Sequence, residues 1–265
     1  TLNPGESFTA PQAILAVSTQ GRNGAIAQQH AAVRARFDWP DGKMRPRPVH
    51  INSWEACYFD HDEPRILGLA QAAASVGIER FVLDDGWFKG RNNDDAGLGD
   101  WTADPAKYPD GIRPLAEKVR AMGMEFGLWV EPEMINPDSD LYRAHPDWAL
   151  ALPNRDRPTA RNQLVLNMAL PEVRDYLFNA IDTLLREAPI SYLKWDHNRD
   201  LAPAGGPAQV AGTYDLFARL RAAHPAVEIE SCAGGGGRSD AGIAAYTHRF
   251  WTSDNLDPVC RTDIQ

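Results

Sequence analysis

Short apolar runs that end in polar residues recur along most of this chain, with helix-like stretches between them. Each run has the length and composition of a β-strand, and we mark seven of them: 49–55, 80–87, 125–133, 164–168, 192–198, 227–232 and 250–255. Between the strands, Leu115, Val119 and Met122 repeat at helical spacing before Gly123, which predicts a helix that ends there. The stretch 171–187 begins with a proline and carries an apolar stripe, which predicts another helix. Regular alternation of strands and helices predicts parallel strand pairing with the helices outside.

This alternation predicts an α/β fold, and more narrowly a (β/α)8 TIM barrel. A barrel of this kind closes with eight parallel strands, whereas this sequence has seven and is therefore expected to be truncated after strand 7. An open, doubly wound sheet is the alternative. We favour the barrel because polar residues cluster at the C-terminal ends of the strands, where barrel active sites lie.

The first 45 residues differ from the rest of the chain. They contain an extended segment over 13–18, a predicted helix over 25–37 and the Pro- and Gly-rich stretch WPDGKMRPRP. We interpret residues 1–45 as the tail of a preceding domain plus a linker. Residues 46–265 then form the incomplete barrel.

Composition and charge narrow the class of protein. An apolar fraction of 43% with 24% charged residues is typical of a soluble globular enzyme. The net charge of −9 argues against nucleic acid or an anionic membrane as the main partner. The three cysteines lack CxxC spacing, so neither a disulfide framework nor a zinc site is indicated. The cysteine pattern and the lack of a visible signal peptide together favour a reducing, cytoplasmic location.

The segment YLKWDHNRD, residues 192–200, carries the strongest candidate chemistry. Side chains alternate along a strand, so Lys194, Asp196 and Asn198 should share one face while Trp195 and His197 take the other. A neighbouring ammonium group would keep Asp196 ionised, as a nucleophile at the mouth of a barrel requires. Taken alone, the segment is equally compatible with a structural ion pair at the end of a strand.

Carboxylates and tryptophans gather at several strand ends. Carboxylates accept hydrogen bonds from sugar hydroxyls, and indole faces pack against sugar rings, so this combination suggests a carbohydrate site. Cleavage of a glycosidic bond needs two carboxyl groups. The residues concerned are Asp84, Asp85, Glu131, Glu133, Asp196, Asp254 and Asp257, with Trp54, Trp87, Trp129, Trp195 and Trp251.

Other readings of the motifs are weaker. The glycine run 234–237 lacks the Lys-Ser/Thr of a phosphate-binding loop and more simply allows close approach of backbone to a sugar. A metal-dependent barrel hydrolase would use His50, His197 and His248, but no HxH or HExxH spacing supports it. A non-catalytic sugar-binding protein is a further alternative, which turnover would exclude.

Together these motifs make the chain resemble a bacterial α-galactosidase of glycoside hydrolase family 36, a melibiase. The matching segments run in family order over most of the chain: HINSWEACYFD, FVLDDGWF, GLGDW, GLWVEPEMIN, HPDW, RNQLVLNM, YLKWDHNRD, ESCAGGGGRSD and FWTSDNLD. So many motifs in register are far more specific than one KWD triplet.

The resemblance implies a retaining hydrolase that removes terminal α-linked galactose from oligosaccharides of the melibiose and raffinose type by double displacement, without metal or cofactor. It implies Asp196 as the nucleophile and Asp254 as the general acid/base, on the predicted strands five and seven, with Asp254 keeping its proton beside another acid and aromatic residues. Glu131 and Glu133 would be supports behind the site. The implied substrate-binding residues are Trp54 and Trp129 as walls, Asp84 and Asp85 on the 4- and 6-hydroxyls, Arg161, Lys194 and Asn198 on other hydroxyls, and Cys232 and Gly235 near the 2-hydroxyl.

Family members carry more than this chain contains. The resemblance makes residues 1–45 the tail of an N-terminal β-sandwich domain plus linker, and implies a homotetramer for the full-length protein. We expect the 265-residue chain alone to be poorly stable and weakly active or inactive, because an unclosed barrel leaves strand edges unpaired. Two alternatives keep the fold: an α-N-acetylgalactosaminidase, which would need more room than Cys232 and its following glycines suggest, and a galactosyltransferase of the raffinose-synthase type.

Overall fold

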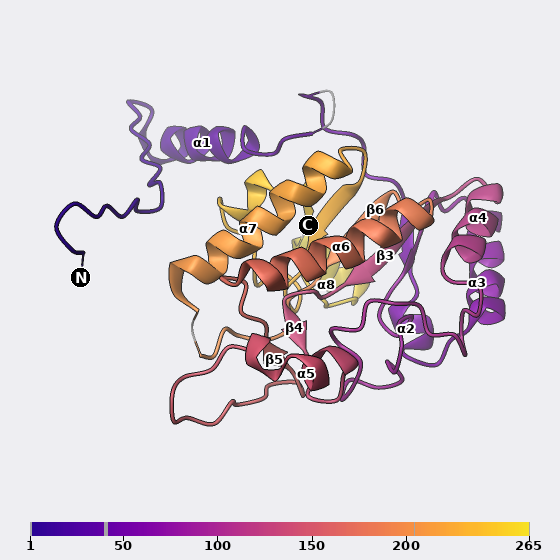
Figure 1. The fold of residues 1–265 in the computed structure, drawn as a ribbon. Helices are drawn as coiled ribbons and strands as arrows, with labels where there is room; N and C mark the ends of the chain where they lie inside the picture. The colour runs from indigo at the N-terminus through magenta and orange to yellow at the C-terminus, as the bar shows by residue number, and fades with distance from the viewer. Residues whose placement is uncertain (1, 40–41, 204, 265) are drawn as a thin grey trace.

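The computed structural model describes residues 2–39, 42–203 and 205–264. Its centre is a six-stranded parallel sheet in the order β1-β2-β3-β6-β7-β8 (Figure 1). The strands are β1 His50–Asn52, β2 Arg80–Leu83, β3 Glu125–Val130, β6 Tyr192–Trp195, β7 Glu228–Ser231 and β8 Arg249–Phe250. Parallel strands with crossover connections confirm the predicted α/β class and correspond to part of a barrel.

Helices fill the crossovers between these strands. The predicted helices at 115–122 and 171–187 are confirmed as α4 Arg113–Ala121 and α6 Pro171–Glu187. The apolar stripe of α6, Val173, Leu177, Ile181 and Leu184, is buried. The other helices are α2 Trp54–Cys57, α3 Glu63–Ser75, α5 Asp140–Ala144, η2 Pro146–Trp148, α7 Gly206–Ala223, η3 Ile243–Ala245 and α8 Pro258–Ile264.

The count of seven barrel strands is wrong. The run at 164–168 supplies only β5 Leu164–Val165, which pairs antiparallel with β4 Met134–Ile135 in a separate ribbon. An apolar run indicates burial but does not select the strand it pairs with. The predicted strands five and seven therefore stand fourth and sixth in the sheet, and they remain next-nearest neighbours.

The sheet curls like part of a barrel wall. Arg80 on β2 forms an ion pair with Glu228 on β7, at 3.2 Å, although β3 and β6 lie between these strands in the sheet. Lys194 on β6 likewise reaches Asp84 after β2, at 2.9 Å. Such contacts across non-neighbouring strands require the inner face to be concave.

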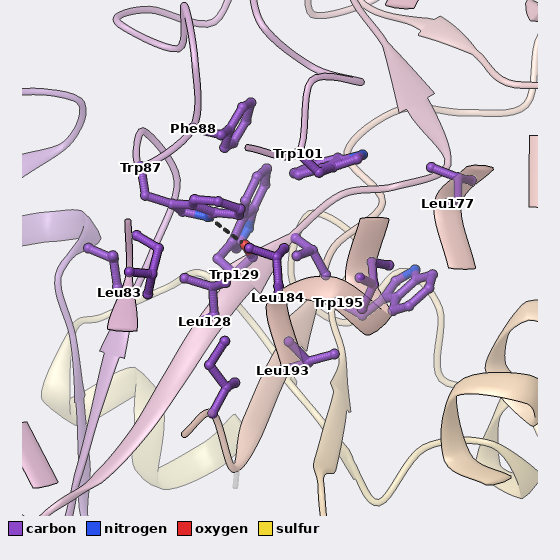
Figure 2. Close-up of a cluster of buried hydrophobic side chains, with 14 of the residues drawn as sticks. Leu83, Trp87, Phe88, Trp101, Leu128, Trp129, Leu177, Leu184, Leu193 and Trp195 are labelled. Atoms are coloured by element: carbon purple, nitrogen blue, oxygen red, sulfur yellow. Dashed lines mark hydrogen bonds between the residues drawn. The ribbon is translucent and has the colours of Figure 1, made fainter. Parts of the chain in front are cut away.

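Large aromatic side chains form the core beside the ends of β2 and β3 (Figure 2). Trp87 and Phe88 pack edge to face, and Phe88 stacks on Trp129. The Trp87 indole N–H donates to the carbonyl of Trp129 at 2.9 Å. This packing fixes the end of β3, where Trp129 meets the cavity described below.

Near the N-terminus, α1 Gly21–Arg34 begins and ends earlier than the predicted helix at 25–37. None of its residues is buried, and Figure 1 shows it lying apart from the sheet with the N-terminal segment. The segment 13–18 forms no regular strand. The assignment of residues 1–45 to a preceding domain stays a prediction.

Candidate active site

A cavity of about 530 Å³ runs along the concave face of the sheet, from His50 and Tyr192 at the starts of β1 and β6 to the C-terminal ends of the strands. Both candidate catalytic carboxylates, Asp196 and Asp254, line it. Seven of the nine predicted substrate-binding residues line it as well: Trp54, Asp84, Asp85, Trp129, Arg161, Lys194 and Asn198.

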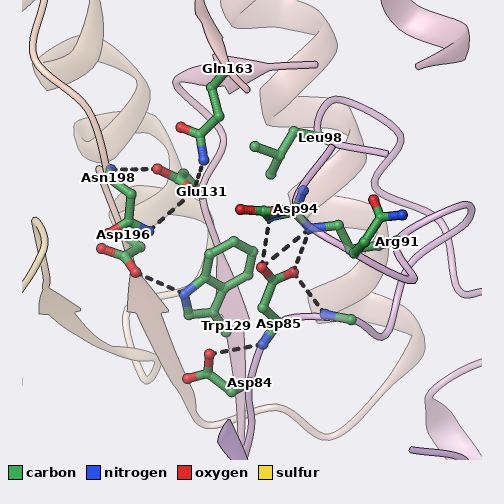
Figure 3. Close-up of polar contacts among 12 residues, drawn as sticks. Asp84, Asp85, Arg91, Asp94, Leu98, Trp129, Glu131, Gln163, Asp196 and Asn198 are labelled. Atoms are coloured by element: carbon green, nitrogen blue, oxygen red, sulfur yellow. Dashed lines mark hydrogen bonds and ion pairs between the residues drawn. The ribbon is translucent and has the colours of Figure 1, made fainter. Parts of the chain in front are cut away.

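Asp196 follows β6 directly, and its carboxylate is held by several donors. The Trp129 indole N–H donates to Oδ2 at 3.0 Å (Figure 3). The backbone N–H of His197 donates to Oδ1 at 2.9 Å. Burial opposes the negative charge, but the Lys194 ammonium and hydrogen bonds from Cys232, Asn198 and Trp129 outweigh it and lower the pKa of Asp196. Asp196 is therefore ionised at neutral pH, as a nucleophile must be.

The alternation predicted along β6 is confirmed, although the partner of Lys194 differs from the expected one. Lys194, Asp196 and Asn198 line the cavity, whereas the Trp195 indole donates to Glu133 on the other side of the strand. Lys194 binds Asp84 directly and acts on Asp196 through its charge.

The two carboxylates after β2 are held differently. The strand ends at Leu83, so Asp84 and Asp85 can both face the cavity instead of alternating. Asp84 accepts hydrogen bonds from Lys194 and from the side chain of Asn52. Asp85 forms a two-pronged ion pair with Arg91, Nε to Oδ1 at 2.9 Å and Nη2 to Oδ2 at 2.8 Å (Figure 3). Burial raises the pKa of Asp85, while Arg91 opposes that shift.

Asp254 lies beyond β8 at the exposed side of the cavity, and the Trp251 indole N–H donates to it at 2.8 Å. Its backbone packs against the glycine run. A Cβ on Gly235 would lie 3.1 Å from the Asp254 backbone nitrogen, and one on Gly236 would lie 2.6 Å from the Thr252 carbonyl oxygen. The expected close approach of backbone at the glycine run is thus present, but toward the chain segment that carries Asp254.

Cys232 and Gly235 do not line the cavity wall. Cys232 is 1% exposed, and its buried thiol helps to lower the pKa of Asp196. Arg161 does reach the cavity, from the two-residue turn 161–162 in which both residues have positive φ, 50° and 59°. Such angles are rare for residues other than glycine and are typical of functional sites.

Glu131 and Glu133 are both buried and lie outside the lining of this cavity, and their role as supports stays a prediction. Burial, and then the charge of Asp196, raises the pKa of Glu131 to about 8. Burial acts against the charge of Glu133 too, but the Arg238 guanidinium and then His197 lower its pKa to about 2.

Within the described residues, no group of three or more His, Cys, Asp or Glu side chains could hold a metal ion. His50 packs near Tyr192, His197 faces a second cavity behind β6, and His248 accepts a hydrogen bond from the Ile229 backbone N–H. In the same part of the chain, no helix has the length and apolar character needed to cross a membrane.

Sequence reasoning missed Arg91 and Asn52, which hold Asp85 and Asp84. Arg91 lies in the polar loop RNNDDAG, six residues after its partner, where no periodic pattern distinguishes a buried side chain from a solvated one. Asn52 is the last residue of β1 and pairs with Val82, two residues before Asp84, so its polar side chain at a strand end was the signal that could have found it.

The family model for melibiase matches residues 7–265. The chain is 48% identical to an α-galactosidase of Escherichia coli over 271 aligned residues, and 45% identical to α-galactosidase AgaA of Geobacillus stearothermophilus over 276. It spans 38% of the length of each of these relatives. A crystal structure of a variant of AgaA in complex with 1-deoxygalactonojirimycin superimposes with a TM-score of 0.85 at 43% identity, covering 94% of this chain and 36% of that one.

A partial parallel barrel with two carboxylates, flanking cations and tryptophans in one mouth defines the class of barrel glycoside hydrolases. Within that class, the chain belongs to the melibiase family, the α-galactosidases of glycoside hydrolase family 36.

Proposed function

We propose that the protein containing this chain is a retaining α-galactosidase that releases terminal galactose from oligosaccharides of the raffinose type. The observation that carries the proposal is the shared cavity of Asp196 and Asp254, in which Asp196 is kept ionised beside Lys194. Two variants of AgaA have been crystallised with raffinose and with stachyose, which supports this substrate class.

In this mechanism Asp196 attacks the anomeric carbon and Asp254 protonates the leaving oxygen. Water then displaces the enzyme from the glycosyl intermediate, with Asp254 now acting as base. Asp84, Asp85, Trp54 and Trp129 would bind the galactose ring. Retaining chemistry requires the two carboxyl groups about 5 to 5.5 Å apart. Asp196 and Asp254 follow next-nearest strands, about 9 to 10 Å apart in backbone spacing, so their side chains would lean inward to close that gap.

The test is hydrolysis of p-nitrophenyl α-galactoside by the full-length protein, with the configuration of the product followed by NMR. We expect α-galactose as the first product, and a loss of about 10⁴-fold or more in kcat for Asp196→Asn. First appearance of β-galactose, or an undiminished rate for Asp196→Asn, would exclude the mechanism. Asp254→Ala should lose most activity on raffinose and less on substrates with good leaving groups, because these need little proton donation.

The proposal also includes the domain that precedes the barrel, the cellular location and the oligomeric state of the full-length protein. Residues 1–45 would belong to an N-terminal β-sandwich domain and its linker, and the full-length protein would be a cytoplasmic homotetramer. Transfer of galactose to a sugar acceptor instead of water is the alternative activity, and product analysis with excess sucrose distinguishes the two.

A further inference from the structure

Glu131 is the first residue after β3 and is 0% exposed, so it cannot touch a sugar in the cavity. Its carboxyl group nevertheless receives three N–H donors from two other loops (Figure 3). Buried carboxyl groups are costly unless hydrogen-bonded, and here every partner belongs to a segment that borders the cavity.

The first of these segments follows β6. The backbone N–H of Asn198 donates to Oε1 of Glu131, and its side-chain amide donates to Oε2 at 3.2 Å. The side-chain oxygen Oδ1 of Asn198 accepts a hydrogen bond from the backbone N–H of Gly234 at 3.2 Å. Asn198 is therefore fixed at its backbone and at both ends of its amide, while it also lines the cavity.

The second segment is the turn that carries Arg161. Gln163 donates its side-chain N–H to Oε2 of Glu131 at 3.2 Å. The backbone of Gln163 exchanges hydrogen bonds with Ala160, at 3.0 and 3.2 Å, which closes the turn on Arg161 and Asn162. Both of these residues have positive φ, a strained conformation that surrounding contacts must hold. Glu131 is one of three side chains that do so, because Asn136 donates to the Asn162 carbonyl at 2.8 Å and Arg199 donates to the Gln163 carbonyl at 2.6 Å.

We propose that Glu131 is a positioning residue for sugar binding, which holds Asn198 and the 160–163 turn so that Asn198 and Arg161 meet the sugar hydroxyls. The inference rests on the proposed galactosidase function. Glu133 shows that burial alone does not give a residue this role. It is buried two residues along the chain, but it binds Arg238, Trp195 and Thr213, away from the cavity of Asp196.

The test compares Glu131→Ala with Glu133→Ala in the full-length protein. For Glu131→Ala we expect KM for p-nitrophenyl α-galactoside and Ki for galactose to rise about tenfold or more, with a smaller change in kcat, because binding groups lose their placement. Glu133→Ala should lower the melting temperature and the active fraction with KM unchanged. Glu131→Ala with KM and Ki within twofold of wild type would overturn the proposal.

If Glu131→Ala does not fold, Gln163→Ala decides the matter. It removes the side-chain link between Glu131 and the turn and leaves the backbone hydrogen bonds with Ala160 in place, and we expect KM to rise at least threefold. An unchanged KM for that variant would overturn the proposal. Turnover by the wild-type protein is measured first, so failure of the galactosidase function is seen separately from failure of this inference.

Discussion

Asp196 is a buried carboxylate, 5% exposed, whose ionised form is stabilised by the Lys194 ammonium and by hydrogen bonds. Lys194 lies two residues before it on the same face of β6 and binds Asp84 across the concave sheet. A single ammonium group thus compensates two carboxylates, one proposed as nucleophile and one proposed to bind the sugar. Because the cavity is partly desolvated, removal of the Lys194 ammonium should strongly weaken the ionised form of both carboxylates.

At this scale we predict that Lys194→Met lowers kcat/KM by about 10² to 10³-fold. It should also move the acid limb of the pH profile. Lys194 lowers the pKa of Asp196, and activity requires the ionised carboxylate, so without Lys194 activity should disappear at a higher pH as the solution is acidified. Measurement of kcat/KM against pH checks this. Lys118→Met, which removes a surface lysine paired with Glu63, is the control and should leave the limb in place.

The loops that follow β7 and β8 pack closely against each other. The loop 233–237 after β7 packs against the segment 252–254 after β8, and only glycines permit the separation. Gly235 has φ of +88°, and a Cβ there would meet the backbone of Ser253 and Asp254 at 3.1 Å. The position of Asp254, the proposed acid/base, therefore depends on the absence of a side chain at Gly235.

We predict that Gly235→Ala lowers kcat/KM about 10²-fold, because a small displacement of a catalytic group is enough for such a loss. Gly234→Ala is the matched control. Its φ is also positive, at +53°, but nothing lies within 4 Å of its added Cβ. It should cost about 1 kcal/mol of stability and leave kcat/KM within about threefold. Equal activities for the two variants would contradict this account.

The curl of the whole sheet is accompanied by buried ion pairs near the N-terminal ends of its strands. Glu228 on β7 pairs with Arg80 on β2, at 3.2 Å, and with Arg249 on β8. Arg80 also binds Glu125 on β3, at 2.6 Å. Breaking a buried pair by removing one partner leaves the other charge uncompensated, so this network should be important for stability.

We predict that Glu228→Gln destabilises the protein by about 3 kcal/mol at pH 7. Burial opposes the charge of Glu228, but Arg80 and Arg249 outweigh it and lower its pKa. A lowered pKa means that its stabilisation is present above its unfolded pKa of about 4.3 and is lost as the pH falls through the folded value. Melting temperatures measured from pH 7 to pH 3 should therefore converge for wild type and variant. A constant difference over that range would rule out the ion pairs as its cause.

Local features could be predicted from the sequence: the α6 stripe, the alternation along β6 and the carboxylates at strand ends. These follow from the short periods of helices and strands, which a sequence displays directly. It also determined the family through its motifs. The folded chain was needed to show that Leu164–Val165 leaves the main sheet, that Lys194 binds Asp84, and that Arg91 holds Asp85. These are contacts between segments far apart in the chain or within an irregular loop. They depend on how the sheet curves and how the loops close, and no local period encodes either.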